Sequence, residues 1–446
     1  MSEVKNLQFG SSMLNAMKNN EKIDTINDTV HLTLHNISRV ESTLICLICK
    51  DSYVQQSQRY VKNTKEMFQN IDFKTDDKDD EAEKLTKDYE ALIEKSIFLY
   101  DRMTELKPES VGKARTTEED YKWGIPIEDA RYIMPLSCKT NMTVTMSTSK
   151  FPLFVYLLYY LSDTFSKDTW KLLLDACDNI DENISKYIMR MVKKVGKGAR
   201  NPVDQYFKND VSTSYVDKVD VKEQALYDLS LGTLMSSASD PEEAIKEYKT
   251  DEDKQKLILR VAGKGHTSIL EQARFKSHHS CSLTCLHQLE RHRLMEIKPV
   301  GFKSLSHLKV KKFMMPKSIA NSKFKKEVDE LIDEWSNFAE DVYNHNPNSL
   351  NSIGCLLNCQ VVPFDLVTNV RADVEVMKQR LCLNAQWEIR RLVNQRKDML
   401  LETNLGFIYK KFALPNCKTI GCQEGSYKNI KCKKKDYNGT MFFYKE

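Results

Sequence analysis

The sequence lacks several features that would place the protein in a special class. No stretch approaches the roughly 18 consecutive apolar residues of a membrane-spanning helix. The polar start MSEVKNLQFGSS does not have the basic and then apolar layout of a signal peptide. The formal net charge is only +4, which is too small to favour nucleic-acid binding by the whole chain. We therefore expect a cytoplasmic protein without membrane spans, for which nucleic acid is an improbable ligand.

The twelve cysteines give little support for disulfides or metal sites. Cys46 and Cys49 lie in the apolar run TLICLIC, where free thiols pack as small hydrophobic groups. Only Cys417, Cys422 and Cys432 suggest a metal site, and no fourth ligand is obvious beside them. We therefore predict no bound metal.

The 446 residues are enough for two or three domains with real cores. The stretch KKVGKGARNPVD (193–204) has the composition of a linker and divides the chain nearly in two. After residue 410 the chain is rich in lysine, which indicates a solvated surface or, alternatively, a phosphate-binding tail. We predict a first repeat at 1–195, a linker at 196–225, a second repeat at 226–410 and a tail at 411–446.

Both halves have the same order of elements. The segments VHLTLHNI (30–37) and ARFKSHHSCSLTCL (273–286) alternate as strands do, the second of them loosely. Apolar residues recur at helical spacing from Leu85 to Leu99 and from Phe324 to Val342. These patterns predict a degenerate internal repeat in an α+β fold, with helices packed on antiparallel sheets.

Three polar clusters carry candidate chemistry. In QLERHRLMEIKPVGFKS (288–304), Arg291 and Arg293 would share one face of a predicted strand. Adjacent cations favour an anion bound between them, and an exposed basic patch is the alternative. In GKGHTSILEQ (263–272), the polar side chains could bind a ribityl or ribose chain, or could mark a helix end followed by a cap. The segment 369–393 predicts one helix, which a salt-bridged surface would also explain.

These clusters resemble the ThyX family of flavin-dependent thymidylate synthases. The family has a signature of the form QxxRHRxxSxNExSxRY, an upstream GHxTxxE turn and a downstream NxR…RxxxxAQWEI helix. The turn is matched by residues 265–271, the QxxRHR opening by residues 288–293 and the helix by residues 369–389.

The departures from the family pattern are complementary. After Arg293 the second half loses the SxNExSxRY part, whereas DSYVQQSQRYV (51–61) resembles it, with Val54 for Asn and Gln55 for Glu. The first half in turn has Leu47, Ile48 and Cys49 in place of RHR. The first half keeps an arginine, Arg131, where the second has Ile353. The second half keeps three polar residues that the first has replaced by Ser147, Ser149 and Leu158.

The resemblance implies two ThyX-like repeats, each a twisted antiparallel sheet with packed helices. It implies methylation of dUMP to dTMP with FAD as cofactor and NADPH and methylenetetrahydrofolate as cosubstrates, in a homodimer that mimics the family's tetramer. The implied nucleotide ligands are Ser57, Arg59, Arg131, Gln288, Arg291 and Arg380, of which Arg380 also activates the uracil. The implied FAD ligands are His266, Ser268, Glu271, His292, Arg293, Asn369 and Arg371.

Two alternatives stay open. Gln55, in place of a carboxylate, allows a ThyX-like flavoenzyme that alkylates C5 of another pyrimidine nucleotide. The degenerate signature also allows a catalytically silent protein that binds nucleotide or flavin.

Overall fold

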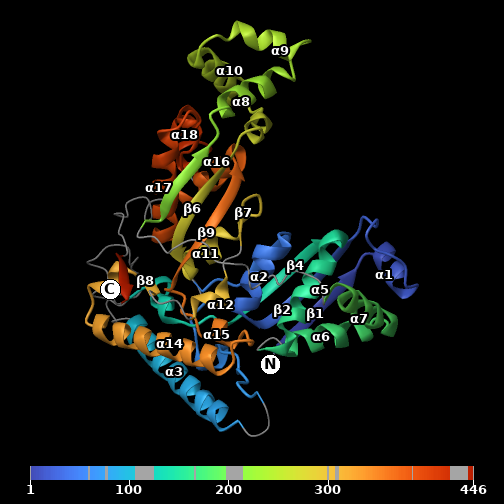
Figure 1. Ribbon diagram of the computed structural model, residues 1–446, viewed down its shortest axis with the longest axis vertical. Coiled ribbons are helices and arrows are strands. Elements are labelled where there is room, and N and C mark those ends of the chain that lie inside the picture. The colour runs from blue at the N-terminus through green and yellow to red at the C-terminus, as the bar shows by residue number, and fades with distance from the viewer. Residues whose placement is uncertain are drawn as a thin grey trace.

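The computed structural model describes residues 2–58, 61–75, 79–105, 125–164, 167–196, 214–298, 301–306, 311–383, 385–421 and 440–444. Within them lie two four-stranded antiparallel sheets, ordered β1-β2-β4-β3 and β5-β6-β9-β7. In both sheets the strands stand in the order first, second, fourth, third along the chain. Figure 1 shows the two sheets in separate parts of the molecule, and the repeated strand order confirms the predicted α+β fold with two similar halves.

The first sheet belongs to the first half of the chain, residues 2–196. Its strands are β1 (Glu3–Phe9), β2 (Thr29–Ser38), β3 (Ser52–Gln55) and β4 (Lys139–Ser147). The helices of this half are α1 (Ser11–Lys18), α2 (Arg39–Cys49), α3 (Asp80–Thr104), α4 (Ile127–Ala130), α5 (Phe151–Tyr160), α6 (Lys167–Asp178) and α7 (Glu182–Gly196).

The second sheet belongs to the second half, from residue 214 onward. Its strands are β5 (Val216–Val221), β6 (Arg274–Ser282), β7 (Glu296–Ile297) and β9 (Val361–Asn369), and β8 (Lys311–Met315) pairs separately with β10 (Thr440–Tyr444). The longer helices are α8 (Ala225–Leu234), α10 (Asp251–Gly263), α11 (Leu283–Leu289), α14 (Lys325–His345), α16 (Val370–Arg380), α17 (Trp387–Leu401) and α18 (Gly406–Phe412). The single-turn helices are α9 (Pro241–Ala244), α12 (Phe302–Leu305), α13 (Lys317–Ala320) and α15 (Asn351–Gly354).

The same local chemistry starts the equivalent helices α2 and α11. Ser38 and Ser282 are their N-caps, and each side chain accepts a hydrogen bond from the backbone N–H of the third helical residue. The first helical residue then bonds to the neighbouring chain segment, from Arg39 N–H to Cys138 O at 2.9 Å and from Leu283 N–H to Gln360 O at 3.0 Å. Arg39 and Leu283 therefore occupy the same place in the two halves.

The halves are joined by reciprocal backbone bonds. Leu136 N–H donates to Leu356 O, and Asn358 N–H donates to Met134 O, each at 2.9 Å. Ser137 and Cys359 make the next such pair, to Gly354 O and Tyr132 O. This exchange of equivalent bonds is what two copies related by an approximate twofold axis would make.

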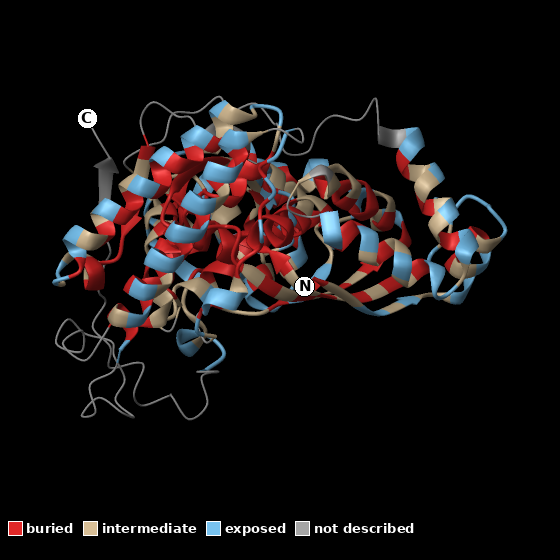
Figure 2. Cartoon of the chain, turned by 90° about the horizontal axis from the view of Figure 1, so that it is seen from below, coloured by how far each residue is buried: buried red, intermediate tan, exposed pale blue. Residues whose placement is uncertain are grey.

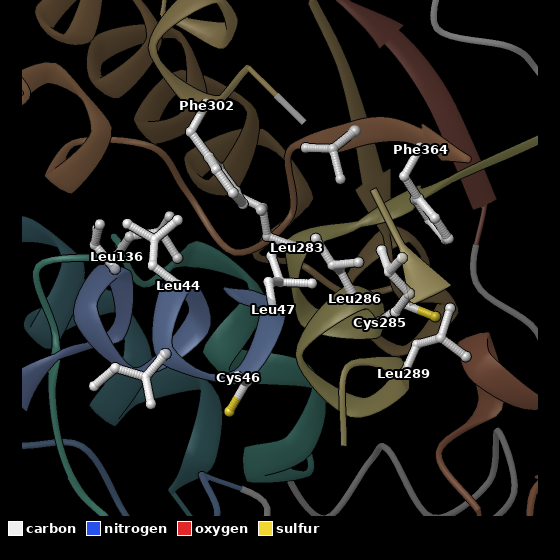
Figure 3. Close-up of a cluster of buried hydrophobic side chains, with 14 of the residues drawn as sticks. Leu44, Cys46, Leu47, Leu136, Leu283, Cys285, Leu286, Leu289, Phe302 and Phe364 are labelled. Carbon is white, nitrogen blue, oxygen red and sulfur yellow. The ribbon is translucent and has the colours of Figure 1, made fainter. Parts of the chain in front are cut away.

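Side-chain packing continues the contact between the halves. Helices α3 and α14 lie side by side, and Trp335 donates from its indole nitrogen to Ser96 Oγ at 2.9 Å (Figure 1). Figure 3 shows Leu47 of α2 beside Leu283 and Leu286 of α11, all of them buried. Buried residues run through the centre of the molecule without a break between the halves (Figure 2).

Several elements differ from the sequence-based expectation. Arg291 to Arg293 lie in a turn after α11, so the predicted strand is wrong. The predicted single helix over 369–393 is two helices, α16 and α17. Residues 216–221, within the expected linker, form β5 of the second sheet, and residues 440–444 of the expected tail form β10. The part of the linker at 197–213 lies outside the described residues.

Within the described ranges, no helix is both long and apolar enough to cross a membrane. The cysteines described there are free thiols, Cys46 and Cys49 buried and Cys417 exposed. Those residues include no group of three or more His, Cys, Asp or Glu side chains placed to hold a metal ion. Cys422 and Cys432 lie outside the described residues.

Candidate functional site

The arginines of the second half meet strand β3 of the first half. Arg293 donates from Nη2 to Tyr53 O at 2.7 Å, and its guanidinium lies 4.7 Å from the centre of the Tyr53 ring. Arg291 Nη2 lies 3.5 Å from Gln55 Oε1, and the Tyr53 hydroxyl donates to Glu290 O at 2.8 Å. One chain thus brings together the RHR residues of one half and the segment of the other half that resembles the rest of the signature.

Arg380, at the last turn of α16, reaches the same turn. Its Nε–H donates to Nε2 of His292 at 2.8 Å, and its Nη2 lies 3.4 Å from Gln288 O. Burial, aided by the Arg380 charge, lowers the pKa of His292 to about 3. The imidazole is therefore neutral at pH 7, with Nε2 as the acceptor and the proton on Nδ1. The side chain of Gln288 is buried, and its Nε2 lies 3.4 Å from Gln386 Oε1.

A second group of candidate residues lies at the other end of α16. Arg371 and Glu271 form an ion pair at 2.5 Å, with both side chains nearly half exposed. Asn369 caps α16, because its Oδ1 accepts from Ala372 N–H at 2.8 Å. Residues 267–271 form a short 3₁₀ helix, η8, that packs on α16, and both His266 and Ser268 are exposed. The eleven residues of α16 place this group about 15 Å from Arg380.

The nucleotide candidates of the first half are placed as follows. Arg131 is buried in the 3₁₀ turn η4 (Arg131–Ile133) and donates from Nε to Glu128 O at 3.0 Å. Ser57 follows β3 by two residues and is partly exposed. Arg59 and Tyr60 lie outside the described residues.

Gln55 is buried and held from both sides. Its Nε2 donates to Ser42 Oγ at 2.6 Å, and its Oε1 faces Arg291. The amide therefore stands where the family signature has a carboxylate, and it contributes no negative charge beside Arg291.

Two buried charged residues near this contact were missed by the sequence analysis. Arg39 lies at the start of α2, and Glu290 directly precedes Arg291. Burial lowers the pKa of Arg39 to about 10, so the guanidinium stays charged at pH 7. Burial also raises the pKa of Glu290 well above its ordinary value, against the charges of Arg291 and Arg39. An arginine at the start of the helix RVESTLICLIC, whose later residues are apolar, was the available signal for Arg39.

The equivalent positions in the opposite half have become part of the core or of local structure. Leu47, Cys49 and Leu158 are buried, and so is Ile353, which is equivalent to Arg131. Ser147 and Ser149 bond to one another, at 3.0 Å between their hydroxyls. The charged and polar candidates thus gather in one of two equivalent places within the described chain.

Comparison with known proteins agrees with this division into two halves. The family described as "Thymidylate synthase complementing protein" matches residues 29–159 and 221–403. The flavin-dependent thymidylate synthase of Pyrococcus furiosus is 30% identical over 200 residues, which cover 42% of this chain and 80% of that protein. Its counterpart from Pyrococcus abyssi is 33% identical over 154 residues, or 32% of this chain and 61% of that protein.

A solved structure of ThyX from Helicobacter pylori, with FAD and dUMP, aligns with 44% of this chain and 98% of its own, at 17% identity and a TM-score of 0.35. The two matched segments of the family together span well over half of the chain under study, one segment in each half. The chain therefore belongs to the thymidylate synthase complementing protein family, the ThyX family, and carries its sequence in two parts.

Proposed function

We propose that the protein is an FAD-dependent thymidylate synthase, which methylates dUMP to dTMP with methylenetetrahydrofolate and NADPH. Membership of the family supports the reaction class. The observation that carries the proposal is the contact of Arg291 and Arg293 with β3, because it joins two incomplete parts of the family signature within one chain. A degenerate pair of halves without a function would have no reason to keep complementary residues in contact.

The nucleotide would lie beside Arg291, Arg131 and Ser57, with Arg59 completing the set. Guanidiniums suit a phosphate dianion because their charge is fixed and their donors are forked. Gln288 and Arg380 would face the uracil end of the nucleotide. Arg380 keeps its positive charge beside the neutral His292, so this side chain can stabilise negative charge on a uracil carbonyl oxygen.

The flavin would use both ends of α16. His292 and Arg293 would lie on the nucleotide side, whereas Asn369, Arg371 and the η8 residues His266, Ser268 and Glu271 would hold the more distant part. The donors fit such a ligand, because the exposed Arg371, His266 and Ser268 can bond to phosphate and hydroxyl groups. Bound FAD supplies the redox and one-carbon-transfer chemistry, and the chain binds and orients the reactants.

The exposure of the α16–η8 group also supports a homodimer. A second chain could cover these residues, so that the fused halves 1–195 and 226–410 would together mimic the family's tetramer. The number of chains in solution, measured by sedimentation with and without FAD, tests this arrangement.

Gln55 supports one alternative within the same chemistry. Its amide presents an oxygen to Arg291 where a carboxylate would form an ion pair. A pyrimidine nucleotide with a different substituent would fit a site in which this neutral amide replaces a negative charge. The second candidate is therefore C5 alkylation of another pyrimidine nucleotide.

The test is to incubate the purified full chain with FAD, NADPH, methylenetetrahydrofolate and dUMP, and to identify the nucleotide product by mass. Formation of dTMP supports the proposal. Bound flavin without dTMP, but with alkylation of another pyrimidine nucleotide, supports the second candidate. A protein that binds no flavin contradicts both.

A further inference from the structure

Among the residues that the structure describes, no carboxylate forms an ion pair with the buried guanidinium of Arg39. It is 3% exposed, and its Nη2 donates to Gln56 O at 3.3 Å. Its Nε has no hydrogen-bond acceptor among the residues that the structure describes. By contrast Arg396, which is also fully buried, pairs with Asp373 at 2.6 Å. A guanidinium in the interior is costly unless a counter-charge accompanies it.

The fold itself does not need an arginine at this position. The equivalent residue in the second half is Leu283, which follows the same serine cap and makes the same backbone bond. Leu283 is fully buried and packs in the core (Figure 3). Because leucine fills the same place in the other half, the charge on Arg39 has a role other than building the helix.

The surroundings of Arg39 are rich in positive charge. The charges of Arg291 and Arg131 act on it, and so do two acidic groups, the Cys138 thiol and the Glu290 carboxyl. Burial raises the pKa of Cys138 to about 11, so this thiol is neutral at pH 7. The charges of Arg39 and Arg291 thus act on one buried carboxyl, that of Glu290, and the charge of Arg131 adds to theirs at Arg39, so the surroundings suit an anionic ligand such as a phosphate.

The hydrogen bond of Arg39 ties it to the substrate side of the fold. Gln56 immediately precedes Ser57 and follows Gln55, which faces Arg291. Arg39 thus anchors the segment that leads out of β3 and lies with Arg131 and Arg291, two of the proposed phosphate ligands.

We propose that Arg39 is a positioning residue of the nucleotide phosphate site, which holds the 56–58 segment through Gln56 and adds a fixed positive charge beneath the phosphate. This inference rests on the proposed function, but it concerns only recognition of the phosphate. It adds to the site a residue for which the second half has only leucine.

The test measures binding of dUMP, deoxyuridine and inorganic phosphate to the FAD-loaded full chain by calorimetry. The variants are Arg39→Leu, which copies the equivalent residue of the second half, Arg39→Gln, which keeps a donor for Gln56, and Arg39→Lys, which keeps the charge. Lys311→Leu is the matched control, because Lys311 is also a buried cation that donates to a backbone carbonyl, that of Ser336 at 3.0 Å, but lies on β8. Thermal unfolding of each variant identifies any that fail to fold.

We expect Arg39→Leu and Arg39→Gln to weaken dUMP binding about 30-fold, the size of one charge-assisted contact, with less than about a threefold change for deoxyuridine. Arg39→Lys should recover part of the loss, and Lys311→Leu should change neither ligand. Equal losses for dUMP and deoxyuridine, or no loss for either, would overturn the inference. If Arg39→Leu does not fold, the contrast between Gln and Lys at this position decides in the same way.

Inorganic phosphate separates this inference from the proposed function. If the wild type binds phosphate but not dUMP, and the Arg39 variants bind phosphate more weakly, the proposed substrate is refuted and the phosphate site is supported. Wild-type protein that binds neither dUMP nor phosphate would refute the phosphate site.

Discussion

The guanidinium of Arg293, from the second half of the chain, lies 4.7 Å from the ring centre of Tyr53, from the first half, and donates to the Tyr53 carbonyl at 2.7 Å. The two residues are 240 positions apart in the sequence. Their contact brings candidate residues of the two halves together within one chain.

Mixing two defective chains tests this arrangement. Arg131→Ala removes a candidate of the first half, and Arg293→Ala removes one of the second half. If both residues serve the site of the same chain, as proposed, co-refolded mixtures of the two variants should show no dTMP formation above that of the separate variants. Mixtures of either variant with wild type serve as the control and should keep activity in proportion to the wild-type share. Recovery of activity in the double mixture would mean that sites form between chains.

Tyr132 gives a prediction for the contact between the halves. Its hydroxyl donates to the buried carboxylate of Glu388 at 2.6 Å and accepts from Gln386 Nε2 at 2.7 Å. Tyr132→Phe removes both bonds without changing the ring, which stacks on Trp387 at 6.0 Å. We expect a loss of roughly 1 to 3 kcal/mol in the free energy of unfolding, measured in urea. As a control, Tyr227→Phe, at an exposed tyrosine, should cost less than about 0.5 kcal/mol. Equal losses for the two variants would show that the hydrogen bonds of Tyr132 do not stabilise the contact between the halves.

The AQWEI segment marks the limit of what the sequence could predict. Its resemblance to the family was readable, but its contacts were not, because Trp387 and Gln386 bond to Asp129 and Tyr132 more than 250 residues earlier. No local pattern encodes a partner at that distance. The repeat, by contrast, was predictable because strand alternation and helical spacing are local properties.

The wrong predictions have causes in side-chain contacts with the backbone. The single helix over 369–393 is interrupted because Gln386 caps α17 and Arg390 donates to the carbonyls of Leu383 and Ala385, each at 3.1 Å, so these carbonyls find partners outside a helix. The turn at Arg291 to Arg293 replaces the predicted strand because Tyr53 bonds to this segment at Glu290 and Arg293. The helix break is therefore local, made by side chains of α17 and its cap, whereas the turn depends on a tyrosine of the other half.

The buried ion pair of Asp373 and Arg396 connects α16 with α17. Both side chains are fully buried, and their atoms lie 2.6 Å apart. Arg396→Met would leave an unpaired carboxyl in the core and should cost roughly 3 to 5 kcal/mol of unfolding free energy. The double variant Asp373→Leu with Arg396→Met should recover most of this loss. Lys378→Met, which breaks an exposed pair with Glu375, is the control and should cost about 0.5 kcal/mol or less.

Because α16 carries candidate flavin residues at its start and Arg380 at its end, loss of the pair should also affect the ligands. We expect Arg396→Met to weaken FAD binding, measured by flavin fluorescence, even at temperatures at which the variant is still folded. Unchanged FAD affinity would show that α16 is held in place without this ion pair.

Buried neutral histidines predict how stability depends on pH. His279 is 1% exposed, stacks on Phe364 with ring centres 5.1 Å apart, and is 2.7 Å from Ser277 Oγ through Nε2. Burial lowers the pKa of His279 well below its ordinary value, and burial and the Arg380 charge lower that of His292 to about 3. At His279 and His292 the unfolded chain therefore binds more protons than the folded chain below about pH 6.5, so the contribution of these two histidines to stability falls as the pH is lowered from 7 to 5.

Each such histidine should add up to about 1.4 kcal/mol per pH unit to this slope. His279→Gln should reduce the slope of unfolding free energy between pH 7 and 5 by roughly 1 kcal/mol per pH unit relative to the wild type. Burial raises the pKa of Glu290 and of Glu388, and these carboxyls change stability with pH in the opposite direction to the histidines. The test therefore compares the slope of the variant with that of the wild type, each measured by urea unfolding at every pH. If His279→Gln has the slope of the wild type, then His279 does not remain neutral in the folded protein.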